Sequence, residues 1–306
     1  MSGRKPQNVS AEWAQRPERS NMRMLRLMAW LSLTLGRRVS RVILACIAAY
    51  FVVFSPAARR ASRAYLTRAL GRRAKITDGY RHVFSFAATV HDRIYLLRDC
   101  YDLFDISLDG AGIVDEVLAS GRGALLFGAH LGSFEVIRAV GRTRPGLKIA
   151  LAMFEDNARM INSMLAAINP SDRPDVIALG RLDAMLRVRD YLDEGALVGV
   201  LADRSLGNEP RAPWPVLGRP AALPIGPFRM AAMLGARVIF MAGLYHGGNR
   251  YAVRFAPIAD FAQVDAVERQ TAIANAMSLY ADEVTRCCRE APSNWFNYFD
   301  FWNEFD

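Results

Sequence analysis

Short apolar runs that alternate with amphipathic segments constrain the fold of this chain more than any other feature. The alternation starts after residue 121 and continues almost to the end of the chain. A strand–helix–strand order favours parallel pairing, and the His-Gly-Gly-Asn turn at residues 246–249 favours one antiparallel hairpin. We therefore predict an α/β fold with a mixed, largely parallel sheet flanked by helices. The expected strands cover residues 124–127, 148–153, 176–179, 196–201, 238–245 and 251–255, and the expected helices cover residues 78–102, 135–140, 157–168, 182–192, 228–234 and 264–289.

The N-terminal quarter differs sharply from the rest in charge. Residues 1–81 hold 17 Arg or Lys and three acidic residues, whereas the remainder of the 306-residue chain holds 22 basic and 27 acidic residues. Such a basic region favours anionic lipid or nucleic acid as a partner. No zinc finger, RNP-like aromatic motif or basic heptad helix supports nucleic acid. We predict an anionic membrane as partner, no nucleic acid, and a boundary between a basic region with membrane-associated helices (residues 1–76) and a catalytic domain (residues 77–306).

An uncharged segment of 17 residues, Val42–Ala58, is the most lipid-like part of the chain. Its length lies at the lower edge of the ~17–25 residues that a spanning helix needs. A second apolar run, Leu27–Leu35, precedes it, and arginines flank the longer segment on both sides. A cleavable signal peptide is disfavoured because the apolar stretch starts late. The sequence leaves open a short span, two helices lying in the interface, or a buried hairpin, and charge at both ends favours the interface.

His130 and Glu135 form an H-x4-E pair between the expected strand 124–127 and the expected helix 135–140. This order places the histidine at the rim of the sheet and the glutamate in the first helical turn. A general base needs one ring nitrogen free to take a proton and the other held by a carboxylate. We therefore predict that His130 and Glu135 are the catalytic pair, with Glu135 accepting the second imidazole N–H. The chain has no GxxxxGK[ST], HExxH or GxSxG motif.

A loop rich in glycine and proline, residues 217–227, precedes the expected helix 228–234. Glycine lets the backbone approach a substrate, and a helix N-terminus offers N–H donors to an anion. Asp203 and Arg204 follow the strand 196–201 at the same edge of the expected sheet. We predict that Arg204, Arg219 and the backbone near Gly226 stabilise an oxyanion or bind the donor substrate.

The C-terminal segment, residues 294–302, holds six aromatic rings and one charge. Rings at this density bury a large area, so we expect the segment to dock on the sheet near the membrane-facing edge. Trp295 and Trp302 leave two interpretations open, a packing anchor for the last helix or a wall of the site for the lipid acceptor.

Three motifs in this order resemble the bacterial lipid A late acyltransferase family, the lauroyl and myristoyl acyltransferases. They are Gly-Ala-His-Leu-Gly-Ser-Phe-Glu at residues 128–135, the strand that ends in Asp203, and the loop at residues 218–227. The resemblance covers about residues 20–302 and implies the fold of the related glycerol-phosphate acyltransferases, with an N-terminal helical membrane anchor. Arg204 departs from the family's usual Asp-Gln pair, and the C-terminus lacks its His-Arg-Arg-Trp ending. This ending is more similar to the branch associated with aryl polyene-type lipid synthesis, so lipid A is in doubt as the acceptor.

The resemblance implies an O-acyltransferase that moves a fatty acyl group from an acyl carrier protein or coenzyme A thioester to a lipid hydroxyl. His130 would deprotonate the hydroxyl, and we assign Ser133, Asp203 and Trp295 to substrate binding. A thioester is already activated, so no metal or cofactor is expected. The expected location is the bacterial inner membrane with the active site facing the cytoplasm, in line with four cysteines that lack metal or disulfide spacing. Two alternatives remain: a glycerolipid acyltransferase that uses a lysophospholipid, and an inactive membrane scaffold.

Overall fold

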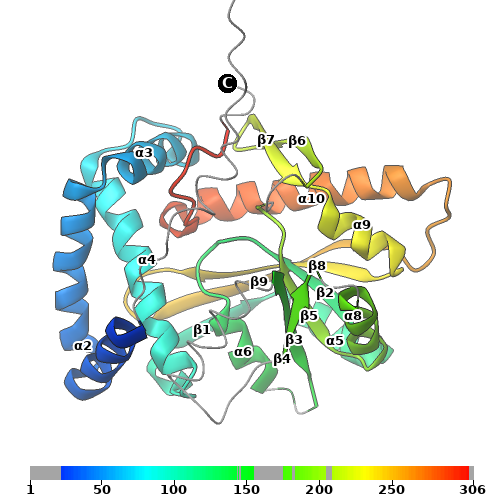
Figure 1. Ribbon diagram of the computed structural model, residues 1–306, viewed down its shortest axis with the longest axis horizontal. Helices are drawn as coiled ribbons and strands as arrows, with labels where there is room; N and C mark the ends of the chain where they lie inside the picture. The colour runs from blue at the N-terminus through cyan, green and yellow to red at the C-terminus, as the bar shows by residue number, and fades with distance from the viewer. Residues whose placement is uncertain are drawn as a thin grey trace, which may run out of the picture.

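The computed structural model describes residues 22–142, 144, 146–154, 175–180, 183–204 and 209–302. In this part of the chain a seven-stranded sheet carries helices on both faces, and three N-terminal helices stand beside it (Figure 1). The expected helix at residues 157–168 lies outside the described residues. The helices are α2 (Met22–Phe54), α3 (Pro56–Leu70), α4 (Ile76–Leu96), α5 (Ala111–Ser120), α6 (Glu135–Arg142), α8 (Ala184–Asp193), α9 (Gly226–Met233) and α10 (Arg269–Glu290).

The sheet is mixed and largely parallel, which confirms the predicted fold class. Its strand order is β1-β9-β8-β2-β5-β3-β4, and only the β8–β9 pair is antiparallel. The hairpin turn between β8 and β9 is the one predicted at residues 246–249. These strands are β1 (Asp105–Asp109), β2 (Ala124–Gly128), β3 (Ile149–Phe154), β4 (Asp175–Leu179), β5 (Leu197–Leu201), β8 (Arg237–Tyr245) and β9 (Arg250–Asp260).

Side chains of β2 alternate between two buried clusters, one on each face of the sheet. Leu125 and Phe127 pack on the face covered by α8, α9 and α10, whereas Ala124 and Leu126 pack on the face covered by α4, α5 and α6. All five residues of β2 are buried, as expected for a central strand of a parallel sheet. Burial of each large apolar side chain contributes roughly 1.5–3 kcal/mol. The core therefore holds the carboxyl end of β2 firmly in place.

Leu27–Leu35 and the first part of the second apolar run, residues 42–54, belong to one kinked helix, α2, and the second run ends in α3. Gly36 interrupts it with φ 77° and ψ 161°, a conformation open to glycine because it has no Cβ. Within the described residues no single helix is long and apolar enough to cross a membrane. Ser32–Phe54 and Pro56–Leu70, bent by 97°, meet the requirement of length and composition only as a pair.

The buried-hairpin alternative for α2 is wrong, because much of its apolar surface faces outward. Its more exposed large apolar side chains include Trp30, Val42, Tyr50, Phe51, Val53 and Phe54, each more than half exposed. By contrast, Tyr65 and Leu66 of α3 are buried in the same cluster as the strands and α10. The N-terminal helices thus combine an outer apolar face with a firm attachment to the sheet.

Several elements differ from the sequence-based expectation. The long helix predicted to end at residue 102 ends at Leu96, and Asp99 then adopts a left-handed φ of 65°. Strand β1 escaped prediction because four of its five side chains are exposed, which erases the apolar alternation. The loop predicted at residues 217–227 contains the turn and the second strand of a hairpin formed by β6 (Arg211–Val216) and β7 (Arg219–Pro224). Prolines concealed these two strands, which tolerate them because each pairs on only one side.

Candidate active site

His130 and Asp203 meet because their two strands are neighbours. Strands β2 and β5 pair in parallel, with Gly128 opposite Leu201, and each of the two polar residues follows two positions after its strand end. The backbone N–H of Ala202 continues the ladder by donating to the Gly128 carbonyl at 2.9 Å. Carboxyl ends of parallel strands share one sheet edge, where ligands commonly bind in open α/β folds.

The imidazole of His130 points its Nδ1 at the Asp203 carboxylate. Nδ1 lies 2.7 Å from Oδ1, and the His130 backbone N–H donates to Oδ2 at 3.0 Å. An ionised carboxylate only accepts, so Nδ1 carries the proton and Nε2 keeps a lone pair. The Asp203 side chain has no exposed surface, whereas the His130 side chain is 32% exposed. The pair thus presents a basic nitrogen to the surface with its orienting carboxylate buried behind it.

Two further donors from the C-terminal segment surround the Asp203 carboxylate. The indole Nε1 of Trp295 donates to Oδ2 at 3.0 Å, and Nδ2 of Asn297 lies 3.5 Å from the same oxygen. Burial acts to raise the pKa of Asp203, but the charge and hydrogen bonds of His130 and the charge of Arg204 outweigh it and lower that pKa. Asp203 therefore stays ionised at neutral pH.

The pKa of His130 is lowered from its ordinary value. Burial is the main cause, the nearby Asp203 carboxylate opposes it, and the positive charge of Arg204 adds to the lowering. A neutral imidazole at neutral pH can accept a proton, which is what a general base requires.

The predicted contact between Glu135 and His130 is corrected by the structure, because Asp203 accepts the second imidazole N–H instead. Glu135 opens α6, and its Oε1 pairs with Nε of Arg93 on α4 at 2.6 Å. Its Oε2 accepts from the Ser133 hydroxyl at 3.0 Å. The arginine on the neighbouring helix draws this carboxylate toward α4. A role for Glu135 in the reaction stays a prediction.

Arg204 was predicted to meet an oxyanion or the donor substrate, and two of its nitrogens are committed elsewhere. Nε donates to Oδ1 of Asn297 at 2.6 Å, and a terminal nitrogen donates to the Phe296 carbonyl at 3.0 Å. The guanidinium also lies over the Phe299 ring, 5.3 Å from its centroid. These contacts hold the C-terminal segment next to Asp203. Arg204 acts on His130 through its positive charge, which contributes to the lowered pKa of the imidazole.

The remaining predicted site residues fall into two groups. Ser133, Asp203 and Trp295 are 2%, 1% and 0% exposed, so their side chains are enclosed by protein rather than open to a substrate. Arg219 opens β7 and Gly226 opens α9, both with exposed side-chain positions. Binding roles for Arg219 and Gly226 stay predictions. Asn297 is a residue that the sequence reasoning missed, because nothing in the sequence places the chain end beside Asp203.

The loop that carries His130 crosses β8 at very short range. Gly132 has φ +64°, and a Cβ on it would lie 1.9 Å from the Gly243 carbonyl oxygen. The Ser133 backbone N–H donates to that oxygen at 2.8 Å. Glycine at both positions permits this approach, which fixes the loop and the direction of the imidazole.

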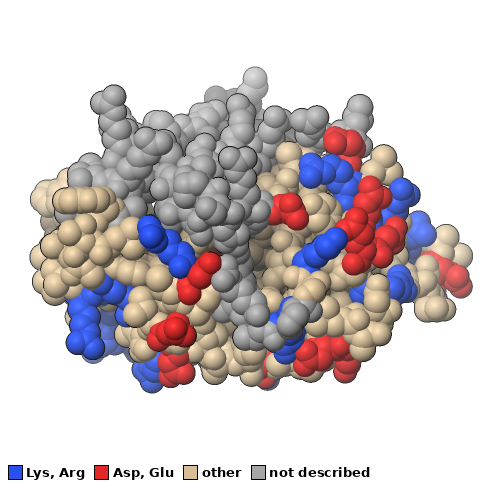
Figure 2. Space-filling model, turned by 90° about the horizontal axis from the view of Figure 1, so that it is seen from below, with Lys and Arg blue, Asp and Glu red and all other residues tan. Residues whose placement is uncertain are grey.

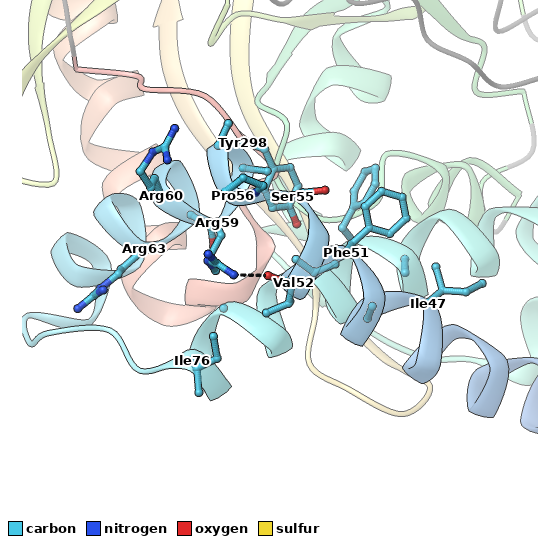
Figure 3. Close-up of a pocket in the computed structure, with 18 of the residues that line it drawn as sticks. Ile47, Phe51, Val52, Ser55, Pro56, Arg59, Arg60, Arg63, Ile76 and Tyr298 are labelled. Carbon is cyan, nitrogen blue, oxygen red and sulfur yellow. Dashed lines mark hydrogen bonds between the residues drawn. The ribbon is translucent and has the colours of Figure 1, made fainter.

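A large apolar cavity of about 1340 Å³ lies among α2, α3, α4 and the C-terminal segment (Figure 3). Apolar side chains of α2 line one side, and cationic residues from α3 and the α3–α4 connection line another. The apolar lining includes Leu44, Ile47, Phe51, Val52, Val83 and Val90, and the cationic residues are Arg59, Arg60, Arg63, Arg73 and Lys75.

Two contacts connect this cavity with the His130 loop. Arg93 lines the cavity and pairs with Glu135, which accepts from Ser133 of the loop. Phe86 also lines it and meets the Phe296 ring edge-on at 5.2 Å, while the Phe296 backbone N–H donates to the His130 carbonyl at 2.9 Å. The cavity lining is therefore linked to the His130 loop through Glu135 and Phe296, whereas His130 and Asp203 are not themselves among the lining residues.

The structure thus contains an oriented general base, His130, and an apolar cavity whose lining suits a hydrocarbon chain. Among the described residues, no group of three or more His, Cys, Asp or Glu side chains could hold a metal ion. A family model described as bacterial lipid A biosynthesis acyltransferase matches residues 13–302, nearly the whole chain. A comparison with curated proteins found no match. The extent of the family match shows that the chain is an acyltransferase and belongs to the bacterial lipid A biosynthesis acyltransferase family.

Proposed function

We propose that this acyltransferase moves a fatty acyl group from an acyl carrier protein or coenzyme A thioester to the hydroxyl of a lipid. The observation that carries the proposal is the His130–Asp203 pair, in which the contact of Nδ1 with the carboxylate leaves Nε2 with the lone pair that a general base needs. Nε2 takes the proton of the hydroxyl while the oxygen attacks the thioester carbonyl. The tetrahedral intermediate then collapses, the C–S bond breaks, and the imidazolium returns the proton to the leaving sulfur. The products are an ester and a free thiol.

Asp203 replaces Glu135 as the carboxylate that orients the base in this mechanism. It holds the Nδ1–H tautomer before the reaction and stabilises the imidazolium during it, the role that aspartate has in Ser-His-Asp triads. The ion pair of Glu135 with Arg93 then serves to fix α6 against α4 at the wall of the cavity.

The apolar cavity is the proposed binding place for a hydrocarbon chain of the substrates. Its volume of about 1340 Å³ exceeds the ~300–1,000 Å³ of most small-molecule pockets, as a long chain requires. The five cations along one side would meet the phosphate of a lipid or of a phosphopantetheine arm. We propose a role in outer-membrane lipid or polyene-lipid synthesis, in which Arg204 and the C-terminal segment, which depart from the pattern typical of the family, put lipid A in doubt as the acceptor.

We also propose that the protein works on an anionic membrane, at the cytoplasmic face of the bacterial inner membrane. The exposed apolar face of α2 and the arginines of α3 support an interfacial position. Figure 2 shows few charged side chains at the left, over the N-terminal helices, apart from a basic group at the lower left, whereas basic and acidic side chains intermingle at the right. Exposed apolar side chains gathered on one helix, as on α2, are typical of a membrane or partner contact.

The experiment compares lipids from cells that carry the parent protein, His130→Ala, or no copy, by mass spectrometry. A lipid that gains one acyl group only with the parent supports the proposal and identifies the acceptor. An acylated glycerophospholipid would make the protein a lysophospholipid acyltransferase. Purified protein that neither transfers nor hydrolyses any acyl thioester would support the scaffold alternative and overturn the proposal.

A further inference from the structure

His82 on α4 joins the N-terminal helices to the C-terminal segment. Its side chain is completely buried and makes two hydrogen bonds across elements. Nδ1 lies 2.8 Å from the Ser62 hydroxyl of α3, and Nε2 lies 2.8 Å from the Trp295 carbonyl. The ring also stacks on Tyr298 at 4.7 Å between centroids. The mechanism proposed above assigns no role to this histidine.

The partners of His82 fix which nitrogen carries its proton. The Trp295 carbonyl can only accept, so Nε2 donates to it, and Nδ1 accepts from the Ser62 hydroxyl. Burial lowers the pKa of His82 to about 4, against the opposing effect of the Trp295 carbonyl. The ring is therefore neutral at physiological pH, and both of its nitrogens have a partner.

Trp295 connects His82 to the active site through its two polar groups. Its carbonyl accepts from His82, while its indole N–H donates to Asp203 at 3.0 Å. Its backbone forms an isolated bridge with Leu131, next to His130. A displacement of the Trp295 main chain would move the indole and with it the donor that holds the Asp203 carboxylate.

We propose that His82 is a positioning residue for acyl transfer, which fixes the Trp295 main chain and so keeps Asp203 aligned with His130. The series Ser62–His82–Trp295–Asp203–His130 then runs from helix α3 to the reacting nitrogen. The inference rests on the proposed function, because it assumes that His130 is the base. The seating of α3, which bears the cationic residues of the cavity, thereby supports the geometry of the catalytic pair.

The central test is His82→Leu, with steady-state kinetics of acyl transfer over a range of pH. We expect kcat to fall by about 10- to 100-fold with little change in KM, since misplaced supporting groups cost rates of this order. The acid limb of the kcat/KM profile should also move to higher pH. Without the Trp295 donor, the Asp203 carboxylate attracts the imidazole proton more strongly. A loss of folded protein alone would lower kcat but leave the limb in place.

His82→Gln and Tyr95→Phe are the rescue and the control. Glutamine can place an amide N–H near the Trp295 carbonyl, so it should recover most of the kcat that leucine loses. Tyr95 also lies on α4 and is buried, but its hydroxyl donates to the Ser32 carbonyl of α2 at 2.6 Å. Tyr95→Phe should therefore leave the acid limb unmoved. Equal kinetics for His82→Leu and Tyr95→Phe would overturn the inference.

A double-mutant cycle with Trp295→Phe tests whether His82 acts through Trp295. Phenylalanine keeps a ring but lacks the indole N–H, so it should reproduce the shift of the acid limb. If His82 acts through Trp295, adding His82→Leu to Trp295→Phe should cost far less than the product of the single effects. Additive losses would contradict the chain of contacts.

Ser62→Ala offers a milder variant if His82→Leu does not fold. It removes only the donor to Nδ1 and should move the acid limb in the same direction, and an unmoved limb would overturn the inference.

His130→Ala distinguishes a failure of the positioning role from a failure of the proposed function. If His130→Ala abolishes transfer while the His82 and Ser62 variants behave like Tyr95→Phe, only the positioning role is wrong. If His130→Ala remains active, the proposed function itself is wrong.

Discussion

Two buried carboxylates, Asp92 and Asp203, anchor two different regions of the molecule. Asp92 on α4 lies where α2 meets the sheet, and Asp203 lies at the ends of β2 and β5. Neither side chain has exposed surface. Asp92 accepts from Arg37, Arg41 and Tyr251, at 2.8, 2.5 and 2.8 Å respectively. Asp203 accepts from an imidazole, an indole and an amide.

The difference between the two regions lies in the partners of the carboxylates, not in their burial. Burial acts to raise the pKa of Asp92, yet His91 and the two arginines lower it to about 2. Arginine keeps its proton at any physiological pH, so the Asp92 region is a fixed ionic clamp. Histidine exchanges its proton near neutrality, so the Asp203 region can do chemistry. We therefore predict that loss of Asp203 lowers the rate of acyl transfer, whereas loss of Asp92 lowers the free energy of unfolding.

Asp203→Asn should give the largest effect on activity. An asparagine amide can donate to Nδ1 and so favour the tautomer with the proton on Nε2, which removes the base. We expect kcat/KM to fall by about 10²–10⁴-fold with the fold retained. Thioester-dependent acyl transfer measures the rate, and circular dichroism measures the fold. A variant that stays within a few-fold of the parent would remove Asp203 from the mechanism.

Asp92→Ala should instead lower the free energy of unfolding. Two partly buried guanidinium groups would lose their counter-charge, and breaking a buried pair in this way costs about 3–5 kcal/mol. Denaturant unfolding measures the loss, and kcat per folded molecule should change far less than in Asp203→Asn. An unfolding curve that matches the parent would mean that α2 does not depend on this clamp.

Glu135→Gln tests which of the two carboxylates near the His130 loop, Glu135 or Asp203, supports the reaction. Glutamine keeps the shape and can still accept from Ser133, but it loses the charge that pairs with Arg93. We expect kcat/KM to fall by no more than about tenfold, well below the loss in Asp203→Asn. A loss as deep as that of Asp203→Asn would restore Glu135 as a catalytic residue.

The two regions should respond to acid in different pH windows. His130 must be neutral to act, and its lowered pKa places the acid limb of kcat/KM below the ordinary histidine value of ~6.5. The pKa of Asp92 is lowered, so its contribution to stability is complete above the unfolded value of ~3.9. That contribution is lost as the pH falls toward about 2. Activity should therefore decline before the protein unfolds. Simultaneous loss of both would show that unfolding sets the acid limit.

The smallest effects are expected at Arg60 and Arg63 of α3, which are exposed and also line the cavity. Arg60→Ala and Arg63→Ala should each weaken binding to anionic vesicles by about fivefold, with a smaller difference at high salt. Vesicle sedimentation with phosphatidylglycerol measures binding, and neutral phosphatidylcholine vesicles provide the control. Arg189 on α8, whose side chain is 55% exposed, offers a matched substitution that should leave binding unchanged. Equal loss in all three variants would argue against a membrane contact at α3.

Local patterns predicted most of the sheet because its strands are buried runs of apolar residues. The expected boundaries for β2, β3, β4, β5 and β8 differ from the structure by at most one residue at each end. Strands without such a pattern were not predicted. They are the exposed strand β1 and the proline-containing strands β6 and β7.

The active-site pair could be predicted only in part, because a local pattern marks His130 but not its partner. His130 follows a clear strand and precedes a clear helix, so its place at the sheet edge could be read from the chain. Asp203 was placed at the same edge but assigned to substrate binding. Its true partner depends on β2 and β5 being neighbours, and the sequence distance between them is 73 residues.

Local sequence patterns were enough to predict the α/β fold class, the basic and apolar N-terminal region, and His130 as the candidate base. These follow from periodicity, composition and local order, which act over a few residues. The three-dimensional contacts were needed to show that Asp203 rather than Glu135 orients the imidazole and that Trp295 donates to Asp203. Strand order and the docking of the chain end are set by which apolar faces pack together. The spacing between two residues in the sequence cannot report that choice.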